Sequence, residues 1–279
     1  MPGIRIRRFD DPHGFARRAR PFLMAAEAEH NLLLGIIDQL LSGEHTFQEP
    51  VYLATIEHDD TVLGCAFRTP PHKVGLTRMP RHAVPHLVEN MRQVYHQVPA
   101  VMGPRSTAVA FGRCWTDRVG GRAELGMRMG VHQLKQVVPP SNPAPGRMRP
   151  AARTDLPLVE EWAAAFADDT GAHTHDPGMA RSLIDRGALF LWQDEVPRSM
   201  AAAVGPTPNG VRIGYVYTPP ASRGHGYASI ITARLSQLQL DLGRRFCFLY
   251  TDLGNRTSNA IYRRLGYRRV AEVVDLLIG

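Results

Sequence analysis

A stretch with two glycines and an arginine, residues 222–230 (SRGHGYASI), follows an apolar Tyr-Val-Tyr-Thr run and precedes a helical pattern. The first turn of a helix has backbone N–H groups without intrahelical partners, and the helix dipole favours negative charge there. Glycine leaves those N–H groups accessible to a phosphate, and Arg223 adds a cation with several donors. The stretch is a candidate phosphate-binding loop, and a plain turn is the alternative interpretation.

Two well-known phosphate-binding motifs differ from this loop. The dinucleotide motif Gly-x-Gly-x-x-Gly has another spacing and needs an acidic residue after the next strand, which the sequence lacks at that place. A Walker loop ends in Gly-Lys-Ser/Thr, and no such run follows here. If the loop binds phosphate, it does so in another structural context.

A second stretch, residues 255–267 (NRTSNAIYRRLGY), contains an asparagine and a tyrosine at helical spacing. Asn259 and Tyr262 are three residues apart, so they lie on one face of a helix expected over about 258–265. A phenol at that position can donate a proton to a leaving group. The alternative for Tyr262 is a core aromatic that packs with Leu265.

The elements that position these stretches follow from the apolar pattern. In the second half, Ala188 begins a strand and Gly243 ends a helix in which apolar residues recur from Ala228 to Leu242. The first half has a similar order of helix, three strands and helix. Strands are expected at 51–60, 61–69, 73–78, 188–193, 199–205, 211–218 and 245–251 and at the C-terminus, and helices at 30–41, 84–98, 156–166, 228–242 and 258–265.

A proline-rich segment and a weak internal repeat divide the chain. Residues 137–151 contain five prolines, which interrupt regular structure. Residues 103–115 align without a gap on residues 254–266, and they share the leading glycine and the arginine two places later. In this register Ala108 faces Asn259 and Phe111 faces Tyr262. We expect domains at 1–140 and 150–279 with a proline-rich linker at 141–149.

Composition limits the class of protein. The 279 residues carry a net charge of +7, but arginines supply nearly all the cations and are dispersed, so we expect no nucleic-acid partner. No apolar run is long enough to span a bilayer and the N-terminus does not resemble a signal peptide, so we expect a cytoplasmic protein without a membrane partner. Three scattered cysteines indicate neither a disulfide framework nor a metal site.

Two histidine pairs invite a metal interpretation. His82 and His86 have metalloprotease spacing, but a proline lies between them and the glutamate after the first histidine is missing. His173 and His175 form a His-x-His pair without a third spaced ligand. We expect no metal site.

Taken together, the two stretches resemble the GNAT superfamily of N-acetyltransferases. Residues 223–228 match its signature Gln/Arg-x-x-Gly-x-Gly/Ala, and residues 255–267 look like its second conserved segment. The strong resemblance covers about 150–279, and over 1–140 it is one of element order only. It implies an α/β (α+β) fold of two tandem GNAT-like domains, each a mixed, mostly antiparallel central sheet flanked by helices. The N-terminal copy lacks the glycine loop and is interpreted as degenerate, as in tandem proteins such as the mycothiol synthase-like enzymes.

The resemblance also implies an activity, acetyl-CoA-dependent transfer of an acetyl group to a primary amine. The cofactor's pantetheine arm would pair with the backbone of residues 216–218, its pyrophosphate would lie on the N–H groups of residues 224–229, and Asn259 would bind the pantetheine. Tyr262 would point at the sulfur and act as the general acid. The implied cofactor-binding residues are Val216, Tyr217, Thr218, Arg223, Gly224, His225, Gly226, Tyr227, Ala228, Ser229 and Asn259, and the implied catalytic residue is Tyr262.

The general base and the acceptor stay open. Asp168, Asp169, His173, His175 and Glu195 are candidates for the base by composition, and a water chain is another. The acceptor is an amine on a small molecule or a peptide, and the resemblance allows a homodimer. A non-catalytic acyl-CoA-binding module or sensor is the alternative function.

Overall fold

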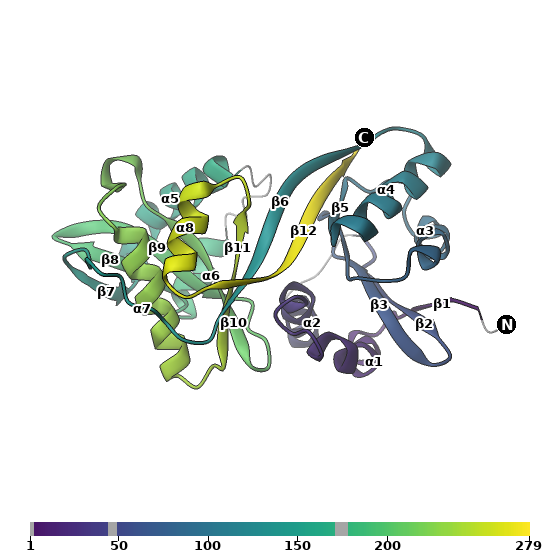
Figure 1. Ribbon diagram of the computed structural model, residues 1–279, viewed down its shortest axis with the longest axis horizontal. Helices are drawn as coiled ribbons and strands as arrows, with labels where there is room; N and C mark the ends of the chain where they lie inside the picture. The colour runs from purple at the N-terminus through teal and green to yellow at the C-terminus, as the bar shows by residue number, and fades with distance from the viewer. Residues whose placement is uncertain (1–2, 44–48, 171–177) are drawn as a thin grey trace. The chain divides into compact units, whose positions relative to one another are not determined.

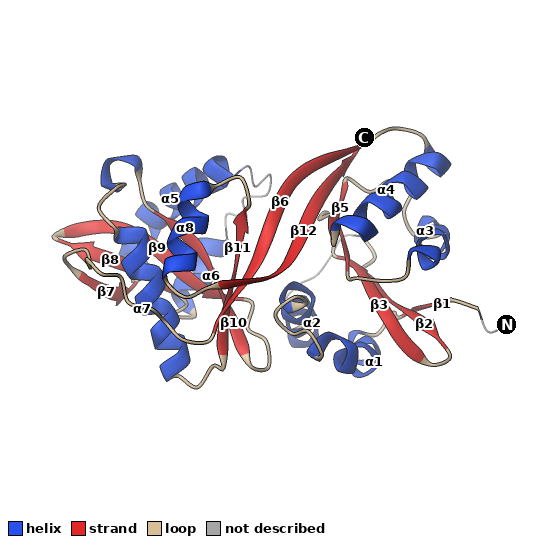
Figure 2. Cartoon of the chain, in the orientation of Figure 1, coloured by secondary structure: helices blue, strands red, loops and turns tan. Residues whose placement is uncertain are grey.

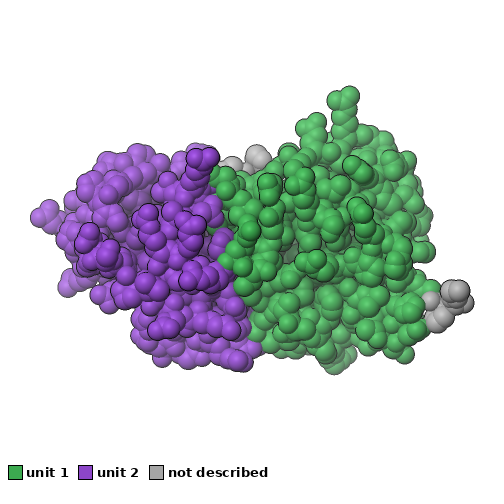
Figure 3. All heavy atoms as spheres, viewed as in Figure 1, with its two compact units in different colours: residues 1–131, 251–254, 269–279 green, residues 132–250, 255–268 purple. Residues whose placement is uncertain are grey.

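The computed structural model describes residues 3–43, 49–170 and 178–279, which form two compact units (Figure 3). Unit 1 contains residues 1–131, 251–254 and 269–279, and unit 2 contains residues 132–250 and 255–268. The division therefore differs from the expected domains at 1–140 and 150–279. The last strand of the chain adds its backbone hydrogen bonds to the sheet of unit 1, so the C-terminus belongs to unit 1.

Unit 1 is a mixed sheet with helices on both faces (Figures 1 and 2). Its strands follow the order β1-β2-β3-β4-β5-β12-β6, with β4 and β5 parallel and the other pairs from β1 to β12 antiparallel. Its elements are β1 (Arg5–Arg8), α1 (Pro12–Met24), α2 (Asn31–Ser42), β2 (Tyr52–His58), β3 (Thr61–Arg68), β4 (Val74–Leu76), η1 (Arg81–Ala83), α3 (Val84–Arg92), β5 (Ala100–Gly103), α4 (Arg105–Val119), β6 (Ala123–Leu134) and β12 (Arg268–Ile278).

Unit 2 has the same kind of sheet, with the strand order β11-β10-β9-β8-β7. Strands β10 and β11 are parallel, and the other pairs are antiparallel. Its elements are β7 (Arg147–Pro150), η2 (Arg153–Asp155), α5 (Leu156–Thr170), α6 (Met179–Asp185), β8 (Leu189–Asp194), β9 (Val196–Val204), β10 (Gly210–Tyr217), η3 (Pro220–Ser222), α7 (Tyr227–Asp241), β11 (Phe246–Asp252) and α8 (Arg256–Arg264).

The two halves of the chain repeat one order of elements. From β1 to β6 and again from β7 to β12, the order is strand, two helices, three strands, helix, strand, helix and strand. Helices α4 and α8 begin at Arg105 and Arg256, each two residues after the glycine that aligns the two stretches. The predicted internal repeat is therefore present in the structure.

Apolar residues on alternating positions of the strands form a separate core on each face of each sheet. In unit 2, Phe190 and Trp192 of β8 pack with α7 and α8, whereas Leu189 and Leu191 pack with α5 and α6. Unit 1 repeats this arrangement, with α3 and α4 on one face and α1 and α2 on the other. Because neighbouring side chains of a strand point to opposite faces, both faces need a helical cover.

The predicted elements of the second half are confirmed within a few residues, and one helix of the first half is shorter than predicted. The pattern from Val84 to Val98 predicts one continuous helix, but α3 ends at Arg92. The amides of Val94 and Tyr95 both donate to the carbonyl of Met91 in a closing turn. Tyr95 and Val98 are buried in the same core as α3, so their apolar spacing reflects burial of a turn.

The proline-rich segment belongs to unit 2 and packs against other elements of that unit. The Val138 amide donates to the Leu265 carbonyl (2.9 Å), and the Trp192 indole donates to the Pro145 carbonyl (2.7 Å). Ala144 is buried in the core that contains α7. The segment expected as a linker is thus anchored at several points, and its last residues belong to strand β7.

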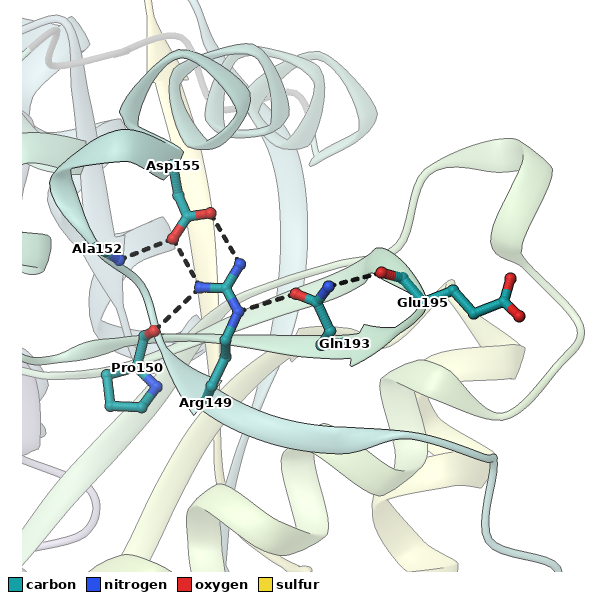
Figure 4. Close-up of polar contacts among 6 residues, drawn as sticks. All are labelled: Arg149, Pro150, Ala152, Asp155, Gln193 and Glu195. Atoms are coloured by element: carbon teal, nitrogen blue, oxygen red, sulfur yellow. Dashed lines mark hydrogen bonds and ion pairs between the residues drawn. The ribbon is translucent and has the colours of Figure 1, made fainter.

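Strand β7 is fixed to the beginning of α5 by a side-chain network (Figure 4). The Arg149 guanidinium donates to both carboxylate oxygens of Asp155 (2.7 and 2.8 Å) and to Gln193 (2.9 Å). Asp155 also accepts the Ala152 amide (2.8 Å). The hydrogen bonds from Arg149 are the main reason that the pKa of Asp155 lies below its usual value.

We expect the substitution Asp155→Asn to lower the free energy of unfolding by about 1–2 kcal/mol at pH 7, because it removes charge-assisted hydrogen bonds from a mostly buried carboxylate. Because the pKa of Asp155 is lower in the folded state than in the unfolded state, its carboxylate stabilises the fold at pH values above the unfolded-state pKa. This stabilisation is lost as the pH falls through the folded-state pKa. The difference between the two proteins should therefore shrink below about pH 4. Urea unfolding at several pH values measures it.

Asp185→Asn is the matched control. Asp185 pairs with Arg153 at a similar distance (2.8 Å), but the Arg153 side chain is 83% exposed. We expect this variant to change the unfolding free energy by less than about 0.5 kcal/mol. If Asp155→Asn and Asp185→Asn lowered the free energy of unfolding equally, burial of the Asp155 carboxylate would contribute nothing to stability.

Among the described residues, no helix is both long enough and apolar enough to cross a membrane.

Candidate functional site

The end of strand β10 has two irregular features. It bulges against β9, and its parallel pairing with β11 stops before the strand itself ends. Parallel pairing with β11 covers residues 210–212 of β10 and 246–248 of β11, whereas β10 continues to Tyr217. The register with β9 shifts between Gly214 and Tyr217, and Tyr215 has a left-handed φ of 51°. A strand that extends beyond its neighbour and bulges there offers backbone groups to an extended ligand. Val216 lies within this bulge.

The glycine loop lies between this strand and α7. Gly224 and Gly226 have φ values of +82° and +83°, which other residues adopt only with strain. No heavy atom would lie within 4 Å of a Cβ on Gly224, and only Ala144 would on Gly226 (3.9 Å). The first helical bond after the loop runs from the Ile230 amide to the Gly226 carbonyl. The N–H groups of residues 227–229 in the first turn of α7 thus have no carbonyl of their own helix to bond.

Arg223 is held in place by partners on both sides. Its Nε donates to the Thr218 carbonyl (3.0 Å), its Nη2 pairs with Asp169 near the end of α5, and its guanidinium lies over the ring of Tyr217. Both charged side chains of this ion pair are half exposed. Asp169, a candidate base from the sequence, therefore balances the charge of Arg223.

The side chains of His225 and Tyr227 contact each other next to the loop. The His225 Nδ1 atom lies 2.8 Å from the Arg223 carbonyl, and its ring stacks on Tyr227. The Tyr227 hydroxyl donates to Asp194 at the end of β8, and this hydrogen bond is the main reason that the pKa of Tyr227 is raised. The Tyr227 hydroxyl is thus bonded to Asp194, while its ring stacks with the loop residue His225.

A buried serine that the sequence does not single out fixes the residues before the loop. The Ser199 hydroxyl donates to the Tyr217 carbonyl (2.7 Å) and lies 2.9 Å from the Thr218 hydroxyl. The Tyr217 ring packs against Trp162 of α5. The only sequence signal for Ser199 is a polar residue at the beginning of an alanine-rich strand.

Helix α8 carries the second set of predicted residues. Asn255 caps the helix, since its side chain accepts the Ser258 amide (3.0 Å). The Asn259 side-chain amide donates to the Asn255 carbonyl (2.7 Å). One turn later, Tyr262 packs against the core of α7 and meets the ring of Tyr267 edge-on, with 6.0 Å between ring centroids.

Burial raises the pKa of Tyr262 to about 12, so its phenol stays protonated at neutral pH. Tyr267 differs because its hydroxyl is fully buried and bonded to Ser236 (2.7 Å). Tyr262 is only partly buried. Of these two neighbouring tyrosines, Tyr262 is the less buried.

Unit 1 has different residues at the corresponding places. The segment between β4 and α3 contains no glycine, and Pro85 in the first turn of α3 has no N–H to donate. Ala108 and Phe111, which align with Asn259 and Tyr262, are fully buried in the core. Unit 1 thus lacks one backbone donor in the first turn of α3, and it has a buried phenylalanine at the position of Tyr262.

The remaining candidates from the sequence lie apart from this site or outside the described residues. Glu195 is exposed in the turn between β8 and β9, where its carbonyl accepts the Gln193 amide and its carboxylate points away from the network (Figure 4). Asp168 is exposed on α5. His173 and His175 lie outside the described residues. Within residues 3–43, 49–170 and 178–279, no three His, Cys, Asp or Glu side chains gather as they would around a metal ion.

Comparison with known proteins places this geometry in a fold family. The model of the family described as FR47-like protein matches residues 193–274, which include the glycine loop and α8. Comparison with curated protein sequences gives no match. Several solved structures align over nearly the whole chain at low identity.

A Drosophila protein has 11% identity and a TM-score of 0.71, with 99% of both chains covered. A GNAT-family acetyltransferase from Colwellia psychrerythraea has 11% identity and a TM-score of 0.59, covering 98% of this chain and 99% of its own. A tandem GNAT protein from the clavulanic acid biosynthesis pathway has 12% identity and a TM-score of 0.59, covering 99% of this chain and 98% of its own. The chain therefore has the tandem GNAT fold along nearly its whole length.

Proposed function

We propose that the protein is an acetyl-CoA-dependent N-acetyltransferase whose site lies in unit 2 and whose acceptor is a primary amine. One observation carries this proposal. The bulged end of β10 runs directly into a loop with two left-handed glycines at the N-terminus of α7. This arrangement can pair with an extended amide chain and, next to it, bind a pyrophosphate.

The residues at the site fit such a ligand. The backbone of Val216, Tyr217 and Thr218 would pair with the pantetheine, and Asn259 would hydrogen-bond it from α8. The N–H groups of residues 224–229, including Ala228 and Ser229, would hold the pyrophosphate, because side chains are absent at the two glycines. Arg223 would contribute positive charge, shared with Asp169. Acetyl-CoA supplies the activated acetyl group as a thioester.

The chemistry requires two proton movements. The amine nitrogen forms a bond to the thioester carbon while the carbon–sulfur bond breaks, so the amine loses a proton and the thiolate gains one. Tyr262 would donate the second proton, since its raised pKa keeps the phenol neutral. We assign removal of the amine proton to water, because Asp169 is held by Arg223. Backbone N–H groups at the bulge of β10 would polarise the carbonyl.

Unit 1 would bind no second cofactor. Pro85 removes one backbone donor from the first turn of α3, the segment before α3 contains no glycine, and Phe111 stands where unit 2 has Tyr262. The likeness to the tandem GNAT protein and to the Colwellia acetyltransferase supports an acetyltransferase built from two such units. We therefore expect one acetyl-CoA per chain.

The test is thermal unfolding and calorimetry with acetyl-CoA. A ligand at 100 times its Kd stabilises the folded state by about 2.7 kcal/mol. We expect saturable stabilisation by acetyl-CoA with a stoichiometry of one. The variant Gly226→Ala should lose most of the affinity, at least about tenfold, because a Cβ and a strained backbone disturb the phosphate-binding N–H groups.

Gly243→Ala is the matched control at the other end of the same helix. Gly243 has a φ of +90° and, like Gly226, has space for a Cβ, so both variants carry similar backbone strain. We expect Gly243→Ala to lower stability by about 1 kcal/mol and to bind acetyl-CoA like the wild type. Equal affinity in all three proteins would sink the proposed phosphate site.

A further inference from the structure

A buried arginine of unit 1 is not among the residues of the proposed acetyl-CoA site. Arg68 is the last residue of β3, opposite Tyr52 of β2, and its side chain is 6% exposed. A charged group at this depth costs free energy unless its donors are hydrogen-bonded and its charge is balanced. The partners of Arg68 therefore indicate what this part of unit 1 does.

Two contacts fix the plane of the Arg68 guanidinium. Its Nε donates to the His72 carbonyl (3.0 Å), and its central carbon lies 4.2 Å from the centroid of the Tyr95 ring. Tyr95 is itself held by its hydroxyl, which donates to the Pro50 carbonyl. A guanidinium stacked on an anchored ring presents its terminal nitrogens in a constant orientation.

One terminal nitrogen of the guanidinium lacks a strong partner. The Nη1 atom is buried and makes no hydrogen bond to the part of the chain that the structure describes. Within residues 3–43, 49–170 and 178–279, its ion-pair partner is Glu49, whose Oε2 is 3.6 Å away, beyond hydrogen-bonding distance, and whose side chain is 53% exposed. The charge of a rigid, buried arginine is thus balanced by a loosely placed carboxylate at the surface.

The surroundings add positive charge. Burial raises the pKa of Tyr52 and of Tyr95. The positive charge of Arg8 opposes this rise at both tyrosines, and that of Arg68 opposes it at Tyr95. Arg8 pairs at 3.5 Å with Asp10, whose side chain is 91% exposed and therefore largely solvated. Arg8 and Arg68 thus lie near two neutral tyrosines, and their carboxylate partners are exposed. This weakly balanced positive charge favours binding of an additional anion.

We propose that Arg68 and Tyr95 form a binding site for a small carboxylate ligand, with Glu49 as an internal carboxylate that the ligand displaces. The planar fork of a guanidinium matches a carboxylate with two parallel hydrogen bonds, which the single long contact to Glu49 does not provide. The repeat that lacks a cofactor loop would thereby retain a ligand site of its own. This proposal is independent of the acetyltransferase function.

The test compares the full-length wild type with Glu49→Gln in thermal unfolding, titrated with glutarate against sodium chloride of equal ionic strength. Glutarate carries the same carboxylate as a glutamate side chain. We expect saturable stabilisation by glutarate, with an affinity about fivefold or more higher in Glu49→Gln, because the competing carboxylate is removed. A purely structural arginine would give no saturable response in either protein.

Three controls define the outcome. Glu89→Gln removes another half-exposed glutamate that faces two arginines, Arg92 and Arg118, and should respond like the wild type. Arg68→Lys keeps the charge but not the planar fork and should lose the response. A titration with inorganic phosphate tests whether the site prefers a carboxylate to another anion. Three outcomes would overturn the proposal. Phosphate could stabilise the protein when glutarate does not, Arg68→Lys could respond to glutarate as strongly as the wild type, or Glu49→Gln could respond no more strongly than Glu89→Gln.

Discussion

Replacing Tyr262 with phenylalanine should lower kcat for acetyl transfer by about 100-fold or more and leave the Kd for acetyl-CoA unchanged. The substitution removes only the hydroxyl that would protonate the leaving thiolate, and the ring keeps its packing against Tyr267. Because the pKa of Tyr262 is about 12, its deprotonation should not limit the wild-type rate below about pH 11. Steady-state kinetics with an amine panel and calorimetry measure both quantities.

Tyr267→Phe is the control for this experiment. It removes a neighbouring hydroxyl that is buried and bonded to Ser236, so it should reduce stability by about 1 kcal/mol without a comparable loss of kcat. Unchanged turnover in Tyr262→Phe would remove Tyr262 as the acid. If acetyl-CoA bound to the wild type and no amine were acetylated, the alternative of a non-catalytic acyl-CoA-binding module would be favoured.

Replacing Leu276 with aspartate should unfold unit 1 while unit 2 stays folded. Leu276 is 4% exposed, pairs with Val101 of β5 and packs over Gly112 of α4, in the core that holds α3 and α4. An unpaired carboxylate in that core should cost about 4 kcal/mol or more. Hydrogen exchange followed by mass spectrometry should show lost protection in β2 and β3 and retained protection in β8 to β10.

The neighbouring residue provides the matched control. Leu277 is on the opposite face of β12 and is 47% exposed, so Leu277→Asp should change protection little. Loss of protection in unit 2 with Leu276→Asp would contradict the assignment of the C-terminal strand to unit 1. Equal effects of the two substitutions would contradict the burial of Leu276.

Local patterns predicted much of unit 2. The apolar spacing from Ala228 onwards and the stop at Gly243 agree with α7, which covers Tyr227–Asp241, and the predicted helix near 258–265 agrees with α8. The two loop glycines adopt the left-handed conformation that only glycine adopts without strain. These features depend on residues a few positions apart, so sequence periodicity reports them directly.

Contacts between distant parts of the chain could not be predicted in this way. The pairing of Arg223 with Asp169 joins residues 54 positions apart, and the Lys73–Asp275 ion pair joins residues 202 positions apart. The buried Arg68 carries no sequence signal, because an arginine at the end of a strand is usually exposed. The proline content of 141–149 indicated a linker, yet Ala144 is buried in the core of unit 2.

The residue types and their spacing thus defined the strand, glycine loop and helix of the candidate site, because backbone conformation and helix periodicity are local properties. The position of the last strand was set by long-range packing: Val274 and Leu276 bury their side chains in the core of unit 1, although they follow α8 of unit 2 in the chain. Long-range packing also determined which carboxylate balances Arg223 and which of the tyrosines 262 and 267 is fully buried. A sequence pattern shows that a residue is apolar or charged, whereas its partner depends on how the elements meet.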